Sequence, residues 1–440
     1  MSFSPLDSTL LGPLFTTAAM RAVFSERNFV AAMLRAEVAL ARAQAPFGLV
    51  PPDLADAIAA ISPDDLDIAA MGEATGLAGV PVIPFVKAVQ SLLPAALEPF
   101  FHKGATTQDI FDTALALQMQ QAFALVADDI AQITAALATL AKTHRATPCV
   151  GRTYGQHAAP VTFGYKVAGW RAGIADAGAQ LPALQARALV ASLGGPVGIL
   201  TAMGAKAQAV KSAYAENLGL GSPAITRHTL RGSMAEAGCW LAILIGALAK
   251  MAVDVANLAS TEVSEVAEPW QPGRGGSSAM PHKRNPVSAT LILAAHSAAR
   301  GHVGTLIDAM AALHERPPGL WHAEWHALPQ LFGHAAGALR EAGILAKGLV
   351  VDEARMLANI DATRGLLFAD AVANRLAPSM GGNAAHHLVE KAAGLVRETG
   401  KGLRDVLAGE GVDAALIAAA FDLSKAVDAG AAATDAALGS

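Results

Sequence analysis

The residues with the clearest chemical potential lie in one glycine-rich segment, Gly273–Pro286, which reads GRGGSSAMPHKRNP. Two prolines and three glycines prevent a continuous helix, so backbone amides stay exposed beside the positive side chains of His282, Lys283 and Arg284. Such a segment can bind a small anion, and its glycines suit a lid that closes over a substrate. A solvated connector with incidental charges would have the same composition. The spacing of a phosphate-binding P-loop is absent.

The segment resembles the signature of the fumarase/aspartase superfamily, a Gly-Ser-Ser-x-Met-Pro-x-Lys-x-Asn-Pro loop. Two further segments match the superfamily's blocks in the expected order. Gly104–Ala114 (GATTQDIFDTA) resembles the first block, and Gly151–Pro160 (GRTYGQHAAP) resembles the second. The length and unusual composition of the signature argue against a chance match. The sequence is therefore identified as a member of the superfamily.

This resemblance implies a mostly α-helical homotetramer with a central bundle of long helices and no cofactor or metal. Each active site would take its three blocks from three different subunits. The enzyme would act on a carbon next to a carboxylate, with Ser277, the first serine of the loop, as the favoured general base. Lys283 and Asn285 would hold the carboxylate on which charge develops. Serine is a poor base unless cations and amides stabilise its ionised form, which this loop could do when closed.

Two departures from the usual pattern indicate the leaving group. Members that eliminate water or an amine usually carry a histidine where this chain has Tyr154, and many carry a partner glutamate where it has Val287–Thr290. A His–Glu pair suits protonation of a hydroxide or amine. A carboxylate, with a pKa of about 4, leaves without that help. The loss of the pair therefore favours a carboxylate as leaving group, or as nucleophile in the reverse direction.

Within the superfamily, the sequence is most similar to the bacterial 3-carboxy-cis,cis-muconate cycloisomerases. This implies reversible lactonisation to 4-carboxymuconolactone, a step of aromatic-acid breakdown in the protocatechuate/β-ketoadipate pathway. A substrate carboxylate adds across a double bond while the enzyme, through Ser277 or Lys283, protonates the adjacent carbon. His157 could replace the missing histidine or be structural. The matching stretches are Met20–Ser25, Leu34–Ala43, Ile83–Lys87, Val161–Gly164 and Trp321–Trp325.

The resemblance also implies a set of substrate-binding residues for a polycarboxylate. Arg152 could order its block instead of touching substrate. His314, His322 and His326, with neighbouring glutamates, show no zincin-type spacing, so no metal site is expected. The predicted substrate-binding residues are Thr106, Thr107, Gln108, Arg152, Tyr154, Gln156, Ser278, Asn285 and Arg316.

Two alternatives remain open. Adenylosuccinate lyases share the Met-Pro-His-Lys-Arg-Asn-Pro form of the loop, and a C–N elimination of that type is one of them. They typically carry an Arg-His-Asp-Val stretch where this chain has Val82–Val86. A non-catalytic, crystallin-like structural role is the other, and the retained Ser277, Lys283 and Asn285 count against it. The sequence does not identify the substrate's 3-substituent, which could be a carboxylate, a sulfonate or a halogen.

Helices must position these blocks. The 440 residues are 53% hydrophobic but only 5% aromatic, and alanine, which favours helices, dominates. We expect long helices over Asp109–His144, Pro160–Leu189, His228–Glu268 and Pro286–His314, and a further helix over Met20–Gln44. The long segments are apolar around much of their circumference. One chain can hardly shield so many apolar faces, so a bundle shared between chains is expected.

The pattern predicts three helical domains in chain order. Residues 1–104 form a small N-terminal domain, residues 105–349 form the long-helix bundle with the signature loop at 272–286, and residues 350–440 form a small C-terminal domain. The net charge of −5 argues against a nucleic-acid partner.

No signal peptide or membrane span is recognised, so a cytoplasmic location is expected. The two cysteines cannot build a disulfide framework. Cys239 is predicted to be a small core residue, and Cys149 either that or partly exposed.

Overall fold

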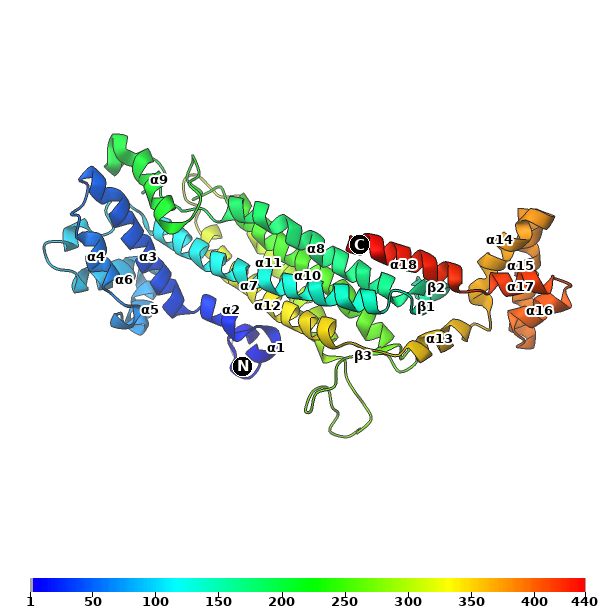
Figure 1. The fold of residues 1–440 in the computed structure, drawn as a ribbon. Coiled ribbons are helices and arrows are strands. Elements are labelled where there is room, and N and C mark those ends of the chain that lie inside the picture. Colours follow the sequence, from blue (N-terminus) through cyan, green and yellow to red (C-terminus); the bar gives the residue numbers. More distant parts are fainter. Residues whose placement is uncertain (1–2, 440) are drawn as a thin grey trace. The chain divides into compact units, whose positions relative to one another are not determined.

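The computed structural model describes residues 3–439, and most of them are helical (Figure 1). Short β-strands form two separate two-stranded antiparallel sheets, β1 (Pro148–Thr153) with β2 (Gln156–Thr162) and β3 (Val266–Ala267) with β4 (Val350–Val351). The predicted all-α class with long helices is confirmed. The long helices are α7 (Thr107–Thr143), α8 (Phe163–Ala188), α10 (Gly232–Leu258), α11 (Val287–Asp308) and α12 (Leu320–Gly348).

The long helices differ from the sequence expectation mainly at their ends. Residues 160–162 belong to strand β2, so α8 begins only at Phe163. Helix α10 ends at Leu258, well before the expected end at Glu268. The expected helix over Met20–Gln44 is two helices, because Ser25 leaves helical geometry and its side chain accepts a hydrogen bond from the Asn28 amide, as an N-cap does. The long helix α12 was not predicted.

Shorter helices make up most of the rest of the described chain. The N-terminal ones are η1 (Pro5–Asp7), α1 (Gly12–Phe15), α2 (Ala18–Val23), α3 (Glu26–Gln44), η2 (Ala45–Phe47), α4 (Leu54–Ala59), η3 (Pro63–Asp65), α5 (Ile68–Ala78), α6 (Val82–Leu92) and η4 (Glu98–Phe100). In the middle lie η5 (Thr201–Lys206) and α9 (Ala207–Leu218). The C-terminal ones are α13 (Glu353–Asp361), η6 (Leu366–Phe368), α14 (Ala369–Met380), α15 (Gly382–Thr399), α16 (Leu403–Gly409), α17 (Ala414–Ala420) and α18 (Ser424–Leu438).

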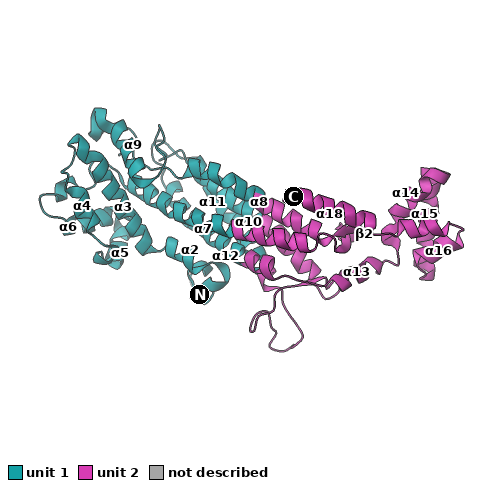
Figure 2. Cartoon of the chain, viewed as in Figure 1, with its two compact units in different colours: residues 1–130, 176–246, 291–340 teal, residues 131–175, 247–290, 341–440 magenta. Residues whose placement is uncertain are grey.

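The chain forms two compact units, each assembled from segments distant in sequence (Figure 2). Unit 1 comprises residues 1–130, 176–246 and 291–340, and unit 2 comprises residues 131–175, 247–290 and 341–440. The division into three consecutive domains stays a prediction.

The core of unit 1 contains an aromatic cluster between the long helices. Phe123 of α7 is fully buried, and its ring lies 5.8 Å from Trp240 of α10 and 5.0 Å from Phe332 of α12, between centroids. The Trp240 indole N–H donates to the carbonyl of Ala177 in α8 at 2.9 Å. Helix α12 also packs tightly on the N-terminal segment, since a Cβ at Gly337 would lie 2.1 Å from the Phe15 carbonyl oxygen. Close packing of long helices therefore builds the unit that contains the first block.

Unit 2 has two packing centres. Val150 of strand β1 belongs to the apolar core of the C-terminal helices, in which the rings of Phe368 and Phe421 lie 4.7 Å apart. Elsewhere, the Trp170 indole of α8 donates to Asp254 of α10 at 2.6 Å. The hairpin that contains the second block is thus fixed to the C-terminal helices.

Helices α7 and α10 are long and apolar enough to cross a membrane by length and composition alone. The core helices of soluble proteins pass the same test, so this is weak evidence for a membrane span.

Candidate active site

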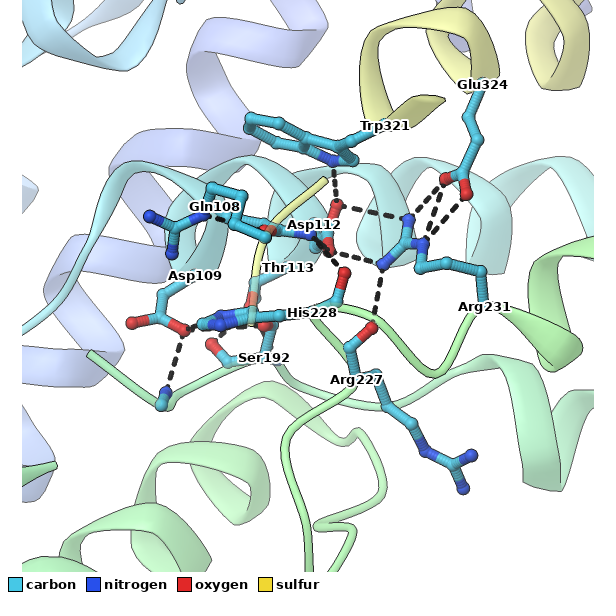
Figure 3. Close-up of polar contacts among 12 residues, drawn as sticks. Gln108, Asp109, Asp112, Thr113, Ser192, Arg227, His228, Arg231, Trp321 and Glu324 are labelled. Carbon is cyan, nitrogen blue, oxygen red and sulfur yellow. Dashed lines mark hydrogen bonds and ion pairs between the residues drawn. The ribbon is translucent and has the colours of Figure 1, made fainter. Parts of the chain in front are cut away.

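The first block begins helix α7 in unit 1, and its two carboxylates are buried (Figure 3). Asp109 accepts hydrogen bonds from the backbone amides of Gly194 and Gly195, both at 2.8 Å, and from that of Thr106 at 3.0 Å. His228 Nε2 lies 2.7 Å from the same carboxylate. Asp109 therefore ties the start of α7 to the Gly194–Gly195 turn.

Asp112 lies three residues further on and belongs to a buried ion cluster. Arg231 contacts Asp112 through Nη1 at 2.6 Å and Glu324 through Nε at 2.9 Å. The Trp321 indole N–H donates to the other oxygen of Asp112, Oδ1, at 2.9 Å, and Arg231 Nη2 also donates to that oxygen at 3.4 Å. We call Asp112, Arg231, Trp321 and Glu324 the arginine cluster. Each of the four side chains is at least 95% buried.

The protonation states in the arginine cluster follow from its charges. Burial alone would lower the pKa of Arg231, but the two carboxylates raise it above its usual value, so the guanidinium stays charged. One cation faces two acids. Burial raises the pKa of Glu324, even though the charge and hydrogen bond of Arg231 oppose that shift. Ion pairs and the hydrogen bond from Trp321 connect the four side chains of the cluster.

Predicted substrate-binding residues of the first block lie at the start of α7. Thr106 and Thr107 are half-buried, whereas Gln108 is fully buried. The Arg316 side chain is exposed, and its Nε donates to Gln108 Oε1 at 3.1 Å. The structure thus brings together two predicted residues that are 208 positions apart in the chain.

The second block forms the β1–β2 hairpin of unit 2. Tyr154 and Gly155 make its two-residue turn with positive φ values of 52° and 76°, as the tight turns of hairpins require. The Tyr154 and Gln156 side chains are exposed at the tip. Because the segment is a hairpin, His157 is not one helical turn from Tyr154, as a helical segment would have placed it. It pairs across the strands with Arg152 instead.

Arg152 is occupied by contacts within the protein. Its two terminal nitrogens donate to the two oxygens of the fully buried Glu265, one at 3.1 Å. Asn359 of α13 donates to Glu265 at 2.8 Å. Partial burial lowers the pKa of His157, and the charge of Arg152 lowers it further. These contacts favour a role for Arg152 in ordering its block.

The signature loop projects from unit 2, and backbone contacts hold its two ends together. We call the residues that make these contacts, Gly275, Gly276, Arg284 and Asn285, the neck of the loop. The Asn285 amide donates to the Gly275 carbonyl at 2.9 Å, and Gly276 and Arg284 form an isolated antiparallel bridge. Gly275 has φ +69°, and a Cβ there would lie 2.7 Å from the Asn285 carbonyl oxygen, so no other residue fits this close approach. Beyond the neck, Ser278 and Lys283 are exposed.

Two backbone amides of the loop contact the side chain of Ser277. Its Oγ accepts hydrogen bonds from the backbone amides of Met280 at 3.1 Å and Ala279 at 3.3 Å. Both donors belong to the loop itself. They would stabilise the ionised hydroxyl of a serine base.

Acidic side chains anchor the exit of the loop. Glu268 accepts hydrogen bonds from the amides of Ser288 and Ala289, both at 2.9 Å, at the start of helix α11. Arg274 binds Glu341 and also donates to the Ser288 hydroxyl at 2.8 Å. The two ends of the loop are therefore fixed to unit 2, whereas residues 277–283 form hydrogen bonds with one another.

Several residues that organise these regions were not predicted from the sequence. Two acids three positions apart in a helix, Asp109 and Asp112, were a visible signal, because that spacing places side chains on the same face. The partners of these acids gave no signal, since they come from distant segments. The unpredicted residues are Asp109, Asp112, His228, Arg231, Glu265, Glu268 and Glu324.

The two cysteines differ in their burial. Cys149 is fully buried in strand β1, and burial raises the pKa of its thiol to about 12. Cys239 of α10 is half-buried, which is less than a core position would give.

A family model described as lyase matches residues 15–301. The chain belongs to this lyase family. The predicted membership in the fumarase/aspartase superfamily is confirmed, and the protein is an enzyme of that superfamily.

Two curated members of the lyase family show how similar the chain is to proteins of named activity. It is 44% identical over 405 residues to a 3-carboxy-cis,cis-muconate cycloisomerase of Pseudomonas aeruginosa, covering 91% of the chain and 88% of that protein. It is 43% identical over 415 residues to a nitrosuccinate lyase of Streptomyces davaonensis, covering 91% of the chain and 87% of that protein.

A solved lyase-family structure has the same fold. The 3-carboxy-cis,cis-muconate lactonizing enzyme of Pseudomonas putida superimposes with a TM-score of 0.93 at 39% identity, covering 98% of each chain. Family membership therefore defines the fold and the general chemistry, while relatives of almost equal identity carry different substrate names.

Proposed function

We propose that this lyase-family enzyme is a 3-carboxy-cis,cis-muconate cycloisomerase. It would interconvert its substrate and 4-carboxymuconolactone in the cytoplasm, as a step of the protocatechuate/β-ketoadipate pathway, without a metal or cofactor. The observation that carries the proposal is Tyr154, which occupies the exposed tip of the second block where a leaving-group histidine would stand. The high identity to named cycloisomerases supports it.

The reaction needs one proton transfer at one carbon. A substrate carboxylate oxygen bonds to one alkene carbon, the π electrons move to the neighbouring carbon, and that carbon takes a proton. Ser277 or Lys283 delivers it in this direction and removes it in the reverse direction. The two amides on Ser277 Oγ support the serine in that role. His157 could assist as a second acid or base.

The remaining predicted residues would bind the three carboxylates of the substrate. Lys283 and Arg316 supply positive charge, and Thr106, Thr107, Ser278 and Asn285 supply neutral donors. At the tip of the hairpin, Tyr154 and Gln156 are free to reach a ligand, whereas Arg152 is held by Glu265. We assign Arg152 to ordering the hairpin.

The active site would be completed by other copies of the chain, in a homotetramer. Large apolar side chains that stay exposed on the long helices support this, since the helices of a bundle bury such side chains against neighbouring helices. Ile243 and Val253 of α10 are 58% and 53% exposed, and Ile307 of α11 is 51% exposed. Each site would combine the first block, the second block and the loop from three subunits.

Mixing Ser277→Ala with Arg316→Ala tests this shared site, at a substrate concentration at which each variant alone has little activity. Tetramers reassembled from equal amounts of Ser277→Ala and Arg316→Ala chains should regain about one quarter of wild-type activity, because random mixing leaves that fraction of sites with both residues. If Ser277 and Arg316 served one site from the same chain, no mixed tetramer would regain activity. Light scattering after gel filtration gives the chain number.

Nitrosuccinate elimination is the second candidate, favoured by the 43% identity to a nitrosuccinate lyase. Nitrite, like a carboxylate, is the anion of an acid much stronger than water or an ammonium ion, so it can leave without a proton donor. The missing His–Glu pair is therefore compatible with both reactions.

Ultraviolet assays with three substrates separate the candidates. Loss of diene absorbance with 3-carboxy-cis,cis-muconate as the preferred substrate is expected. Preference for nitrosuccinate would favour the second candidate, and preference for adenylosuccinate would favour C–N elimination. An inactive protein would favour the crystallin-like role. Sulfonate- and chlorine-substituted muconates would then identify the natural 3-substituent.

A further inference from the structure

Gln108 contacts both Asp112 of the arginine cluster, beside which it lies in Figure 3, and the exposed Arg316. Its Nε2 donates to Asp112 Oδ2 at 3.2 Å and to the His228 carbonyl at 2.9 Å, and its Oε1 accepts from Arg316 Nε at 3.1 Å. The side chain is fully buried. Both of its amide hydrogens are used within the protein, so the residue has no donor left for a substrate.

The surroundings permit only one orientation of the Gln108 amide. Both oxygens of Asp112 accept hydrogen bonds from Arg231, and one of them also accepts from the Trp321 indole N–H, so the carboxylate faces Gln108 as an acceptor. The His228 carbonyl is also an acceptor. A flipped amide would turn its oxygen toward both acceptors and its nitrogen toward Arg316. The arginine cluster therefore forces the Gln108 oxygen to face Arg316.

Arg316 is held at one nitrogen and free at the others. Within residues 3–439, its Nε bonds to Gln108 and no hydrogen bond or ion pair is formed by its two terminal nitrogens. The side chain is otherwise exposed. Fixing Nε fixes the plane of the guanidinium, and the two terminal nitrogens then form a fork that matches the two oxygens of a carboxylate.

We propose that Gln108 is a positioning residue: it holds the Arg316 guanidinium so that its terminal nitrogens are presented as a ready-made fork to one carboxylate of the substrate. This inference rests on the proposed function for the identity of that carboxylate. It changes the role of Gln108 from direct substrate binding to orienting the residue that binds. The arginine cluster, which touches no substrate, thereby contributes to recognition.

A double-mutant cycle tests this role. Gln108→Met keeps the volume of the side chain but removes all of its hydrogen bonds to Asp112, His228 and Arg316. Arg316 must then be ordered by the substrate itself, and we expect KM to rise roughly 2- to 12-fold, with kcat changed much less. In an Arg316→Ala background, Gln108→Met should cause no further rise in KM, because its effect passes through Arg316.

The control is Gln118→Met on the same helix. Gln118 is also buried and donates through Nε2, to the Val23 carbonyl at 2.7 Å, but it does not contact Arg316. This variant should leave KM unchanged. If Gln108→Met and Arg316→Ala raise KM additively, Gln108 binds substrate directly. If Gln108→Met lowers kcat and the melting temperature in both backgrounds without raising KM, its role is structural. Either result would overturn the proposal.

A binding measurement separates failure of this inference from failure of the proposed function. If the wild-type enzyme turns over none of the three substrates, the proposed function fails, and the same cycle is run on the Kd for tricarballylate by calorimetry. Non-additive weakening of tricarballylate binding would support the positioning role without turnover. Additive weakening, or no binding by the wild type, would rule it out.

Discussion

The first block of unit 1 and the signature loop of unit 2 both carry charged side chains, but those of the first block are buried and those of the loop are exposed. Asp109 and Asp112 of the first block are buried, as is Arg231, which pairs with Asp112, and each has several partners. In the loop, Lys283 and Arg284 are exposed and only the neck is tied down. A buried charge without a partner costs too much free energy to persist, whereas a loop that closes over substrate, as we propose for this one, must exchange its contacts to do so. The comparison teaches that the buried region maintains geometry and the exposed one is available for reaction.

Replacing Ser277 should separate activity from stability most clearly. If Ser277 is the acid–base group, Ser277→Ala should lower kcat roughly 10²- to 10⁴-fold. The melting temperature should not change, because only two loop amides lose a partner. Steady-state kinetics and thermal unfolding measure the two effects. Ser278→Ala is the matched control. An equal loss of kcat in that variant would contradict the assignment of Ser277 as the acid–base group.

Removing Arg231 should have the reverse effect, with a large loss of stability. Arg231→Met leaves the buried Asp112 and Glu324 without their cation, which should cost roughly 3–5 kcal/mol of unfolding free energy. Denaturant unfolding gives the value. Arg187→Met is the control, because the Arg187–Glu236 ion pair is exposed in the same unit and should contribute far less. Equal losses from the two substitutions would contradict the distinction between buried and exposed charge.

Two glycines at the base of the loop, Gly275 and Gly273, should differ in how well they tolerate a side chain. At Gly275 there is no room for one, whereas at Gly273 there is room but the backbone conformation would be strained. Gly275→Ala would place a Cβ against the Asn285 carbonyl, whereas Gly273, with φ +80°, has nothing within 4 Å of a Cβ. We expect Gly275→Ala to lower kcat/KM roughly tenfold or more, and Gly273→Ala to lower it less. Similar losses would show that backbone strain, and not the close approach, governs the neck. Kinetics with a circular-dichroism check of folding decide this.

The smallest expected effect is a pH dependence of stability in unit 1. Burial, with a further contribution from the nearby His302, lowers the pKa of His334 to about 4. The unfolded chain takes up a proton on this side chain near its ordinary pKa of 6.5, while the folded chain does so only near 4. Stability from His334 is therefore present above about pH 6.5 and is lost as pH falls toward 4. Melting temperatures between pH 7 and 5 should fall less steeply in His334→Phe than in the wild type. The same change at the exposed His386 should leave the slope unaltered.

Much of the molecule could be predicted from residue order. Helices α7, α8, α10 and α11 follow from apolar repeats at three- and four-residue spacing, which is a local property of the chain. The loop around Ser277 identified the superfamily, because its chemistry is contiguous in sequence. Helix α12 was not predicted, since its early turns contain histidine and tryptophan in place of the aliphatic repeat.

The hairpin of the second block was not predicted from the local sequence. Its turn depends on positive φ values at Tyr154 and Gly155, and tyrosine gives no warning of that conformation. The position of Tyr154 at a tip, and that of His157 opposite Arg152, follow from strand pairing. The residue types follow from the sequence, but the directions in which the side chains of Tyr154 and His157 point do not.

By itself the sequence determined the superfamily, four of the five long helices and the position of the signature loop, because each depends on neighbours along the chain. Only the tertiary structure showed that Arg231 joins Asp112 to Glu324, and that Gln108 faces Arg316. These partners lie about one hundred to two hundred residues apart. Their pairing is decided when the helices pack, because a charge removed from water must then find a partner in whichever segment has been brought beside it.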